Sequence, residues 1–309
     1  MNTIKNILIC GLGAIGSVCA TKIVQNTNVT LKVLADNKRI ENYKKNPLVF
    51  NDKIYDFDYI TPNAKNFEAD LIIIATKNNA IPEVLQNIEP FINKNTIILS
   101  LLNGLKSEDD IAEKFGEEKT LYSYYIGHTS TRIDRKVFND DVYKIVFGKK
   151  DNSTIDEQTQ AVKAFFEEIN IKYEIPIDMD YARWWKFLVN VGYNQASAVL
   201  NANYSAFQNS QKVNSFAIKL MEETAMIAKA EGVKNTEKMI PEVLKVIKTM
   251  LPQTRTSMLQ DIDAKRQTEV DAFAGYVCNL GRKHNIKTPY NDMFLELIQA
   301  IDEKNSLQV

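Results

Sequence analysis

Short, uninterrupted apolar runs recur through the first half of the chain and constrain its fold more than any other feature. Four of them are NILIC (6–10), TLKVLA (30–35), LIIIAT (71–76) and TIILSLL (96–102). Because they do not alternate with polar residues, they are typical of parallel strands covered on both faces. The stretches between them, GAIGSVCATKIVQN and NNAIPEVLQNIEPFI, have helical spacing. This βαβ rhythm predicts a doubly wound sheet.

The pattern changes after Pro176. Before it, runs at 120–126, 143–148 and 171–175 predict further strands around one helix near 156–169. After it we find no strand signal, and the spacing predicts helices at about 180–202, 206–231, 236–249, 257–284 and 290–303. A chain of 309 residues suits two domains. We expect residues 1–177 to form an α/β domain and residues 178–309 to form an all-helical domain.

The composition excludes several kinds of protein. A net charge of −1, with lysines spread throughout, argues against a nucleic-acid surface, and no apolar run approaches the length of a membrane span. The apolar start imitates a signal peptide, but three glycines in six residues make it a poor one. Three cysteines without a CxxC and only two histidines fit a reducing cytoplasm and predict no protein-bound metal. A small molecule remains the expected partner.

The stretch ICGLGAIGS places a GxGxxG turn directly after the first strand and at the start of a helix. Gly11 permits the tight turn, Gly13 lets the backbone approach a pyrophosphate, and Gly16 allows close helix–strand packing. Free N–H groups at the helix start then hold the phosphates. The context favours a dinucleotide site in an N-terminal Rossmann-type sheet over glycines that serve only turn and packing. The cofactor-binding residues expected here are Gly11, Leu12, Gly13, Ala14, Ile15 and Gly16.

The end of the second strand should contact the adenosine ribose. Its residues do not agree on which cofactor they favour. Asp36 would accept a hydrogen bond from the ribose of NAD and repel a 2′-phosphate, whereas Lys38 and Arg39 favour NADP. Both cofactors stay open. Lys77, just past another strand, either contacts the nicotinamide half of the cofactor or is an ordinary surface lysine.

Lys186, Asn190 and Asn194 follow one another at four-residue steps within RWWKFLVNVGYNQ. On an α-helix such residues share one face over about 12 Å. A solvated edge is the ordinary interpretation of such a row. The neighbouring tryptophans and Phe187 favour burial instead, and buried polar groups without partners cost several kcal/mol. We therefore expect a polar ligand, or other protein groups, to satisfy the row.

The chain resembles the ketopantoate reductase (2-dehydropantoate 2-reductase) family in GLGAIG, LLNGL, WWKFLVNVGYNQASA and TSMLQDIDAKRQTEVDAFAG, which occur in the family's order. The resemblance implies that Lys186 is the general acid of ketone reduction, with Glu269 beside it. It implies that Asn190 and Asn194 bind the 2-keto acid, that Ser257 holds its carboxylate, and that Asn103 lies between cofactor and substrate. The resemblance implies NADP as cofactor, and a homodimer is compatible with it.

The chemistry agrees with these roles. Hydride transfer to a ketone leaves an alkoxide, and an ammonium supplies both a proton and a positive charge to it. Burial would lower the pKa of Lys186 and a nearby Glu269 would restore it. Ser257 and Glu269 would lie about 18 Å apart on an unbroken helix, too far to share a small substrate. We therefore predict a break, with Thr268 as N-cap, Asp271 completing a capping box and Glu269 in the next first turn. One long helix is the alternative.

Some residues depart from the family or lack a role. Asp36 stands where most members have Arg, and YSYYIGHTSTRIDR (122–135) lacks the expected Gly/Pro pattern. We interpret His128 and His284 as structural or exposed, and the thiols as small core residues. Two alternatives stay open beside a ketopantoate reductase: an NAD-dependent D-2-hydroxy acid dehydrogenase for mandelate-like substrates, and a non-catalytic nucleotide-sensing protein. The KxxxN spacing from Lys186 disfavours a 3-hydroxyisobutyrate-type enzyme, which has KxxN.

Overall fold

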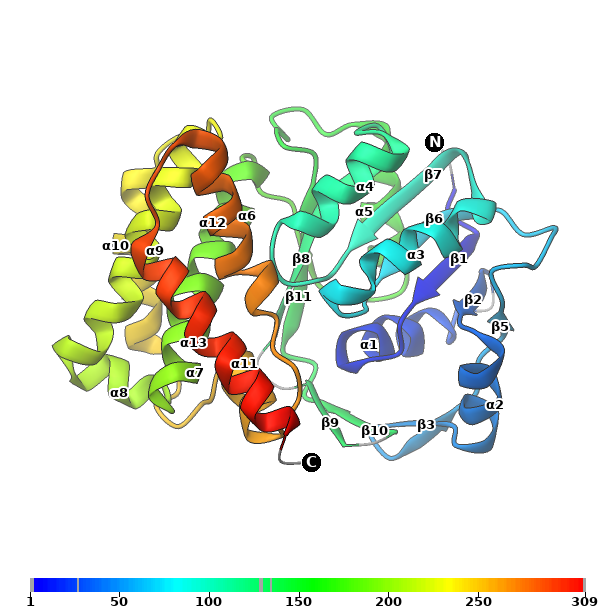
Figure 1. Cartoon of the computed structure of the whole chain (residues 1–309). Coiled ribbons are helices and arrows are strands. Elements are labelled where there is room, and N and C mark those ends of the chain that lie inside the picture. Colours follow the sequence, from blue (N-terminus) through cyan, green and yellow to red (C-terminus); the bar gives the residue numbers. More distant parts are fainter. Residues whose placement is uncertain (1–2, 27, 128–129, 134, 308–309) are drawn as a thin grey trace. The chain divides into compact units, whose positions relative to one another are not determined.

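A computed structural model describes residues 3–26, 28–127, 130–133 and 135–307, and these divide into two compact units (Figure 1). The first unit contains residues 1–103 and 107–179. The second contains residues 180–309 together with Gly104–Lys106. The division lies two residues past the predicted boundary, and no sequence feature predicted that a three-residue segment belongs with the helices. Leu105 is buried in the helical core, which accounts for that exchange.

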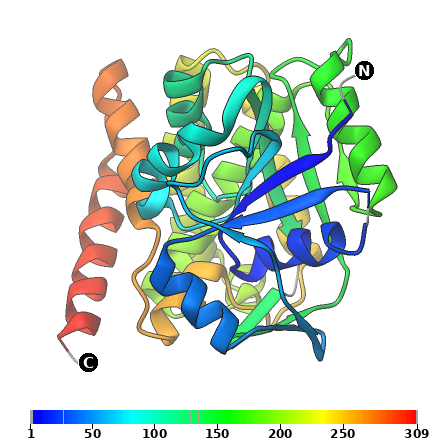
Figure 2. The ribbon, with the colours of Figure 1, turned by 90° about the vertical axis from the view of Figure 1, so that its right-hand side faces the viewer.

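The first unit is built on a mostly parallel eight-stranded sheet of order β12-β11-β8-β7-β6-β1-β2-β5. Only β8 and β11 pair antiparallel, and Figure 2 shows the twist between the blue and the green strands. The eight strands are β1 (Asn6–Cys10), β2 (Thr30–Leu34), β5 (Tyr59–Ile60), β6 (Ala69–Ile74), β7 (Ile92–Ser100), β8 (Thr120–Gly127), β11 (Tyr143–Gly148) and β12 (Tyr173–Glu174). The predicted α/β class and the continuous apolar strands are confirmed.

Helices cover both faces of this sheet, so successive strand residues enter different cores. In β1, Ile7 and Ile9 face a core that includes α1 (Ala14–Ile23) and α5 (Glu157–Glu168), while Leu8 and Cys10 face one with α3 (Ile81–Ile88) and α4 (Lys106–Phe115). Both faces are therefore apolar, which explains the uninterrupted runs in the sequence. A further helix, α2 (Asn37–Lys45), follows β2.

A second, four-stranded sheet of order β4-β3-β10-β9 was not predicted. Its strands are β3 (Leu48–Phe50), β4 (Lys53–Tyr55), β9 (Ser130–Ile133) and β10 (Lys136–Asn139). They are only three or four residues long, too short to give a periodic signal. Segment 122–135, which lacks the family's Gly/Pro pattern, forms the end of β8 and all of β9. Residues 128–129 and 134 lie outside the described residues.

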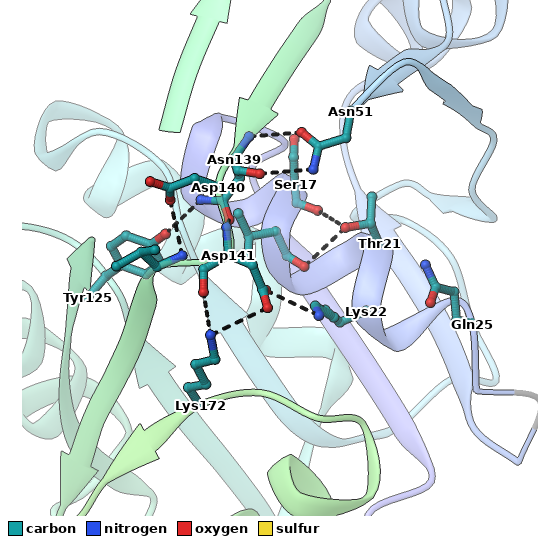
Figure 3. Close-up of polar contacts among 12 residues, drawn as sticks. Ser17, Thr21, Lys22, Gln25, Asn51, Tyr125, Asn139, Asp140, Asp141 and Lys172 are labelled. Carbon is teal, nitrogen blue, oxygen red and sulfur yellow. Dashed lines mark hydrogen bonds and ion pairs between the residues drawn. The ribbon is translucent and has the colours of Figure 1, made fainter. Parts of the chain in front are cut away.

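The loop after β10 fastens this second sheet to α1, the helix that follows the glycine turn (Figure 3). Asn139 exchanges two hydrogen bonds of 2.9 Å with the side chain of Asn51, between β3 and β4. Asp141 pairs with Lys22 at the end of α1 (3.3 Å) and with Lys172 before β12 (3.4 Å). The ion pair of Asp141 with Lys22 therefore joins the C-terminal end of α1 to the loop after β10.

The second unit is all-helical, as predicted. Its elements are α6 (Met179–Val189), a π-helical turn η3 (Asn190–Asn194), α7 (Gln195–Leu200), α8 (Tyr204–Asn209), α9 (Gln211–Ala230), α10 (Thr236–Thr249), α11 (Ser257–Asp263), a 3-10 turn η4 (Val270–Ala272), α12 (Ala274–His284) and α13 (Pro289–Ser306). Two predicted helices are interrupted: 180–202 contains the π turn, and 206–231 divides at Ser210. No helix among the described residues is long and apolar enough to cross a bilayer.

Candidate active site

The glycine turn lies between β1 and α1, and its three glycines are needed for different reasons. Gly11 has φ +102°, and a Cβ there would lie 2.6 Å from the carbonyl oxygen of Ala75. A Cβ on Gly16 would overlap the carbonyl oxygen of Gly11. A Cβ on Gly13 would meet only Ala75, at an ordinary 3.7 Å. The protein itself therefore requires glycine at 11 and 16 but not at 13.

The open space at Gly13 suits a bound group at the start of α1. Gly13 is the N-cap of α1 and has no side chain to bond the first N–H groups of the helix. Such N–H groups, with the helix dipole behind them, bind phosphates. The missing Cβ leaves room for a pyrophosphate to approach, so the turn fits a dinucleotide.

Asp36 follows β2 and caps α2, and its carboxylate is partly engaged. Its Oδ1 accepts a hydrogen bond of 2.8 Å from the backbone N–H of Arg39, and its Oδ2 lies 3.4 Å from Arg39 Nε. Both side chains are more than half exposed. The carboxylate and the guanidinium that favour opposite cofactors are thus paired with each other.

Two more segments end at the same edge of the sheet as Gly11 and Asp36. Lys77 is an exposed residue after β6, and Asn103 lies after β7. Asn78 donates a hydrogen bond of 2.8 Å from its side chain to the carbonyl oxygen of Asn103. Sequence reasoning missed Asn78, although its place beside Lys77 past a strand end was a usable signal. The carboxyl edge of a parallel sheet is where cofactors bind in such folds.

Lys186 occupies the last turn of α6 and is half-buried, and the next residue, Phe187, belongs to an aromatic cluster. Phe187 packs edge-on against Trp184, Phe273 and Tyr276, with ring centroids 5.7–6.3 Å apart. Lys186 Nζ has no hydrogen-bond or ion-pair partner in the part of the chain that the structure describes. Burial lowers its pKa to about 8, the direction that the sequence predicted.

Asn190 and Asn194 lie at the two ends of the π turn and are both buried, at 3% and 6% exposure. The side-chain amide of Asn194 donates to Asn190 Oδ1 (3.5 Å) and to Ser257 Oγ (3.2 Å). Ser257 is exposed at the start of α11, where the preceding Thr256 caps the helix. Three residues expected to bind substrate are therefore brought together.

The π turn corrects the predicted geometry of this row. On an α-helix each four-residue step overshoots a full turn, so the row would drift around the helix. A π turn, with bonds to the fifth residue, contains more residues per turn, so the step from 190 to 194 no longer overshoots. Such turns are rare and are frequent at functional sites.

The predicted break between Ser257 and Glu269 is confirmed, but the predicted capping box is wrong. α11 ends at Asp263, and Glu269 is a half-buried residue directly before the 3-10 turn η4. Thr268 does not cap a helix, because its hydroxyl donates to Asp302 Oδ2 on α13 at 2.7 Å. Asp271 accepts from Gln299 of the same helix at 2.8 Å. Tertiary contacts with α13, not local capping, hold the segment that carries Glu269.

The cysteines and His284 lie in the interior or at the surface as structural residues. Cys10, Cys19 and Cys278 are buried free thiols, and burial raises the pKa of each. His284 pairs with Glu231 at the surface of the helical unit, and His128 lies outside the described residues. No cluster of three or more His, Cys, Asp or Glu side chains suited to a metal occurs within the described ranges.

Two family models match the chain: "Ketopantoate reductase PanE/ApbA" over residues 7–152 and its C-terminal domain over residues 178–302. The chain belongs to the ketopantoate reductase family. It is accordingly an NAD(P)-dependent oxidoreductase of that family, acting on a 2-keto acid.

Relatives within the ketopantoate reductase family match the chain over almost its whole length. A 2-dehydropantoate 2-reductase from Streptococcus pyogenes serotype M3 is 28% identical over 98% of this chain and 99% of its own. One from Pyrococcus horikoshii is 27% identical over 95% and 96%.

Solved structures share the fold. D-mandelate dehydrogenase with NADH and anilino(oxo)acetate has a TM-score of 0.83 at 23% identity, over 97% of this chain and 99% of its own. The Methylococcus capsulatus 2-dehydropantoate 2-reductase has 0.82 at 20%, over 97% and 98%. A dimeric ketopantoate reductase from Staphylococcus aureus has 0.76 at 20%, over 97% and 99%.

Proposed function

We propose that this protein reduces 2-dehydropantoate to (R)-pantoate for pantothenate synthesis in the cytoplasm, with Lys186 as general acid. The observation that carries the proposal is a half-buried ammonium with a lowered pKa on the same helical run as a buried pair of amides. The full-length similarity to 2-dehydropantoate 2-reductases supports this substrate. A homodimer, as for the dimeric Staphylococcus aureus relative, is part of the proposal.

NAD(P)H supplies the hydride that is added to the ketone carbon. Lys186 would stabilise the oxygen as negative charge develops on it and would then donate a proton to it. A pKa of about 8 suits this role, because the amine stays mostly protonated at neutral pH yet gives up its proton more readily than an ordinary lysine. Glu269 would act beside Lys186, helping to maintain its protonation.

Asn190, Asn194 and Ser257 would hold the substrate through neutral hydrogen bonds. The amide of Asn194 already points at both of the other two side chains, which fixes its orientation before substrate binds. Preorganised donors of this kind cost little reorganisation during the reaction. Ser257 is the exposed member of the three and would meet the carboxylate.

The cofactor would bind at the edge formed by the glycine turn, Asp36, Lys77 and Asn103. The backbone of residues 11–16 would hold the pyrophosphate. Asp36 keeps lone pairs free for a ribose hydroxyl even though Arg39 engages both of its oxygens. This carboxylate favours a second candidate function: NADH-dependent reduction of a bulkier 2-keto acid to a D-2-hydroxy acid.

One assay separates these candidates. The purified chain is given 2-dehydropantoate or benzoylformate, each with NADPH and with NADH, alongside Lys186→Ala. The proposal expects preference for 2-dehydropantoate and a loss of turnover on the order of 10²-fold or more in the variant. Near-native turnover by the variant would refute the proton-donor role, and preference for benzoylformate would favour the second candidate.

Cofactor binding is measured separately. If Asp36 accepts a hydrogen bond from the ribose, Asp36→Ala should weaken NADH binding about tenfold. Binding of NADPH should be unchanged or tighter. Binding of either cofactor without turnover across a panel of 2-keto acids would instead point to a nucleotide-sensing protein.

A further inference from the structure

Gln195 is a fully buried amide directly after the π turn, and its side chain bonds to other elements of the helical unit. Its Nε2 donates to the carbonyl oxygen of Val191 at 2.8 Å. Its Oε1 accepts from the backbone N–H of Ala274, the first residue of α12, at 3.1 Å. Nothing in the roles assigned above uses this side chain.

The bond to Val191 lies where a π turn needs support. When the N–H to C=O bonds of a helix change from the fourth to the fifth residue, the ladder changes register and a carbonyl loses its usual donor. Gln195 supplies a donor to a carbonyl inside the turn, between Asn190 and Asn194. The turn also lies close against α9, because a Cβ on Gly192 would come within 2.6 Å of Met221.

The bond to Ala274 reaches the segment that follows Glu269. Glu269 leads into η4, then Phe273, then α12, where Ala274 has one of the unpaired N–H groups of a helix start. The side chain of Gln195 therefore joins the backbone of the π turn, which carries Asn190 and Asn194, to the segment that begins with Glu269.

A buried carboxylate, that of Glu223, lies at the far end of this junction. Gln195 Nε2 also lies 3.4 Å from Asn291 Oδ1, and the amide of Asn291 donates to Glu223 Oε2 at 2.7 Å. Glu223 in turn accepts from the backbone N–H groups of Tyr290 and Asn291 at the start of α13, both at 2.9 Å. A carboxylate at a helix N-terminus is stabilised there, so the chain of bonds ends on a rigid point.

We propose that Gln195 is a positioning residue for ketone reduction: it sets the π turn that aligns Asn190 with Asn194 and fixes that turn relative to the segment of Glu269. The inference rests on the proposed function of those residues. Gln195 does not touch substrate in this proposal. It acts through the backbone of Val191 and Ala274.

The test compares Gln195→Met with Gln208→Met. Methionine keeps the length of the side chain and removes its hydrogen bonds to Val191, Ala274 and Asn291. Gln208 is the matched control, because its amide also donates to two backbone carbonyls, those of Ile247 (2.9 Å) and Met250 (2.8 Å), away from the π turn. Each variant is measured for kcat and KM with 2-dehydropantoate and for Kd of the cofactor. Amide hydrogen exchange is followed in peptides covering 189–196 and 270–275.

For Gln195→Met we expect kcat/KM to fall on the order of 10- to 100-fold, since a small misplacement of substrate-binding groups is that costly. The cofactor Kd should not change, and exchange should accelerate in both peptides. Gln208→Met should retain kcat/KM and leave both peptides unaffected. The proposal is overturned if kcat/KM of Gln195→Met stays within about twofold of the unmodified protein, or if Gln208→Met loses as much.

Failure of the proposed function gives a different result. In that case the unmodified protein would turn over neither 2-dehydropantoate nor other 2-keto acids, and exchange alone would decide the role of Gln195. Faster hydrogen exchange in both peptides of Gln195→Met would support the connection that Gln195 makes between the π turn and α12. Acceleration in one peptide or in none would overturn it.

Discussion

Replacing Lys186 with methionine should make this protein more stable and inactive at the same time. Burial lowers the pKa of the ammonium from 10.5 to about 8, and at pH 7 this costs the folded state about 3 kcal/mol relative to the unfolded chain. Methionine has a similar length and no charge, and the residues close to position 186 in the sequence include the apolar Trp184 and Phe187. The free energy of unfolding should therefore rise by up to about 3 kcal/mol at pH 7.

The gain should depend on pH in a defined direction. Below about pH 8 the lysine is protonated in both states, and the folded state bears the whole cost. Between about 8 and 10.5 the folded state loses its proton while the unfolded chain keeps it, so the unmodified protein gains stability as pH rises. The difference between Lys186→Met and the unmodified protein should shrink through that window and vanish above it.

Lys149 provides the matched control, since burial lowers its pKa as well. Its Nζ, however, donates to the carbonyl oxygens of Glu117, Glu118 and Thr120 at 3.0–3.2 Å. Lys149→Met leaves these carbonyls without their donor and should destabilise by about 1–3 kcal/mol.

Urea denaturation at a series of pH values measures both variants, and an unchanged m-value shows that the midpoint reports stability. Turnover of Lys186→Met should fall on the order of 10²-fold or more. The reasoning is refuted if Lys186→Met is destabilised at pH 7 as Lys149→Met is, or if its advantage stays constant from pH 8 to 10.5.

Four further substitutions test other parts of the molecule. Gly13→Ala should keep the unfolding midpoint almost unchanged and weaken cofactor binding about tenfold in a titration, whereas Gly16→Ala should fail to fold because its Cβ overlaps Gly11. Thr268→Val should lower the free energy of unfolding by about 1–3 kcal/mol, measured in urea, because Asp302 loses the hydroxyl of Thr268. Asn194→Ala should raise KM for the 2-keto acid about tenfold and leave the cofactor Kd unchanged, and a change in Kd alone would contradict its assignment.

Much of the fold could be predicted because its signals are local. A strand buried on both faces needs an apolar residue at every position, so β1, β6 and β7 appear in the sequence as continuous runs. Gly11 and Gly16 are required by contacts within the turn they form or the strand beside it. The four short strands of the second sheet escaped prediction because each has only three or four residues, and the one pairing that joins them into a sheet, β3 with β10, connects segments far apart in the chain.

The residues of the candidate site could also be identified from short sequence motifs, but their arrangement in space could not. The spacing of Lys186, Asn190 and Asn194 identified the row, and the sequence could not show the π turn that straightens it. The break before Glu269 was predicted because an unbroken helix would hold Ser257 and Glu269 too far apart, and a capping box was the expected means. In the structure Thr268 bonds instead to Asp302, 34 positions away.

The sequence by itself determined which candidate groups this protein carries: a glycine turn directly after the first strand, a lysine, and two asparagines at four-residue steps from that lysine. Only the tertiary structure decided how they are held, through the bond of Gln195 to Ala274 across 79 positions and the bond of Asn194 to Ser257 across 63. The physical reason is that propensity and periodicity act over a few neighbouring residues, whereas a buried hydrogen bond depends on which distant backbone groups the fold leaves without partners.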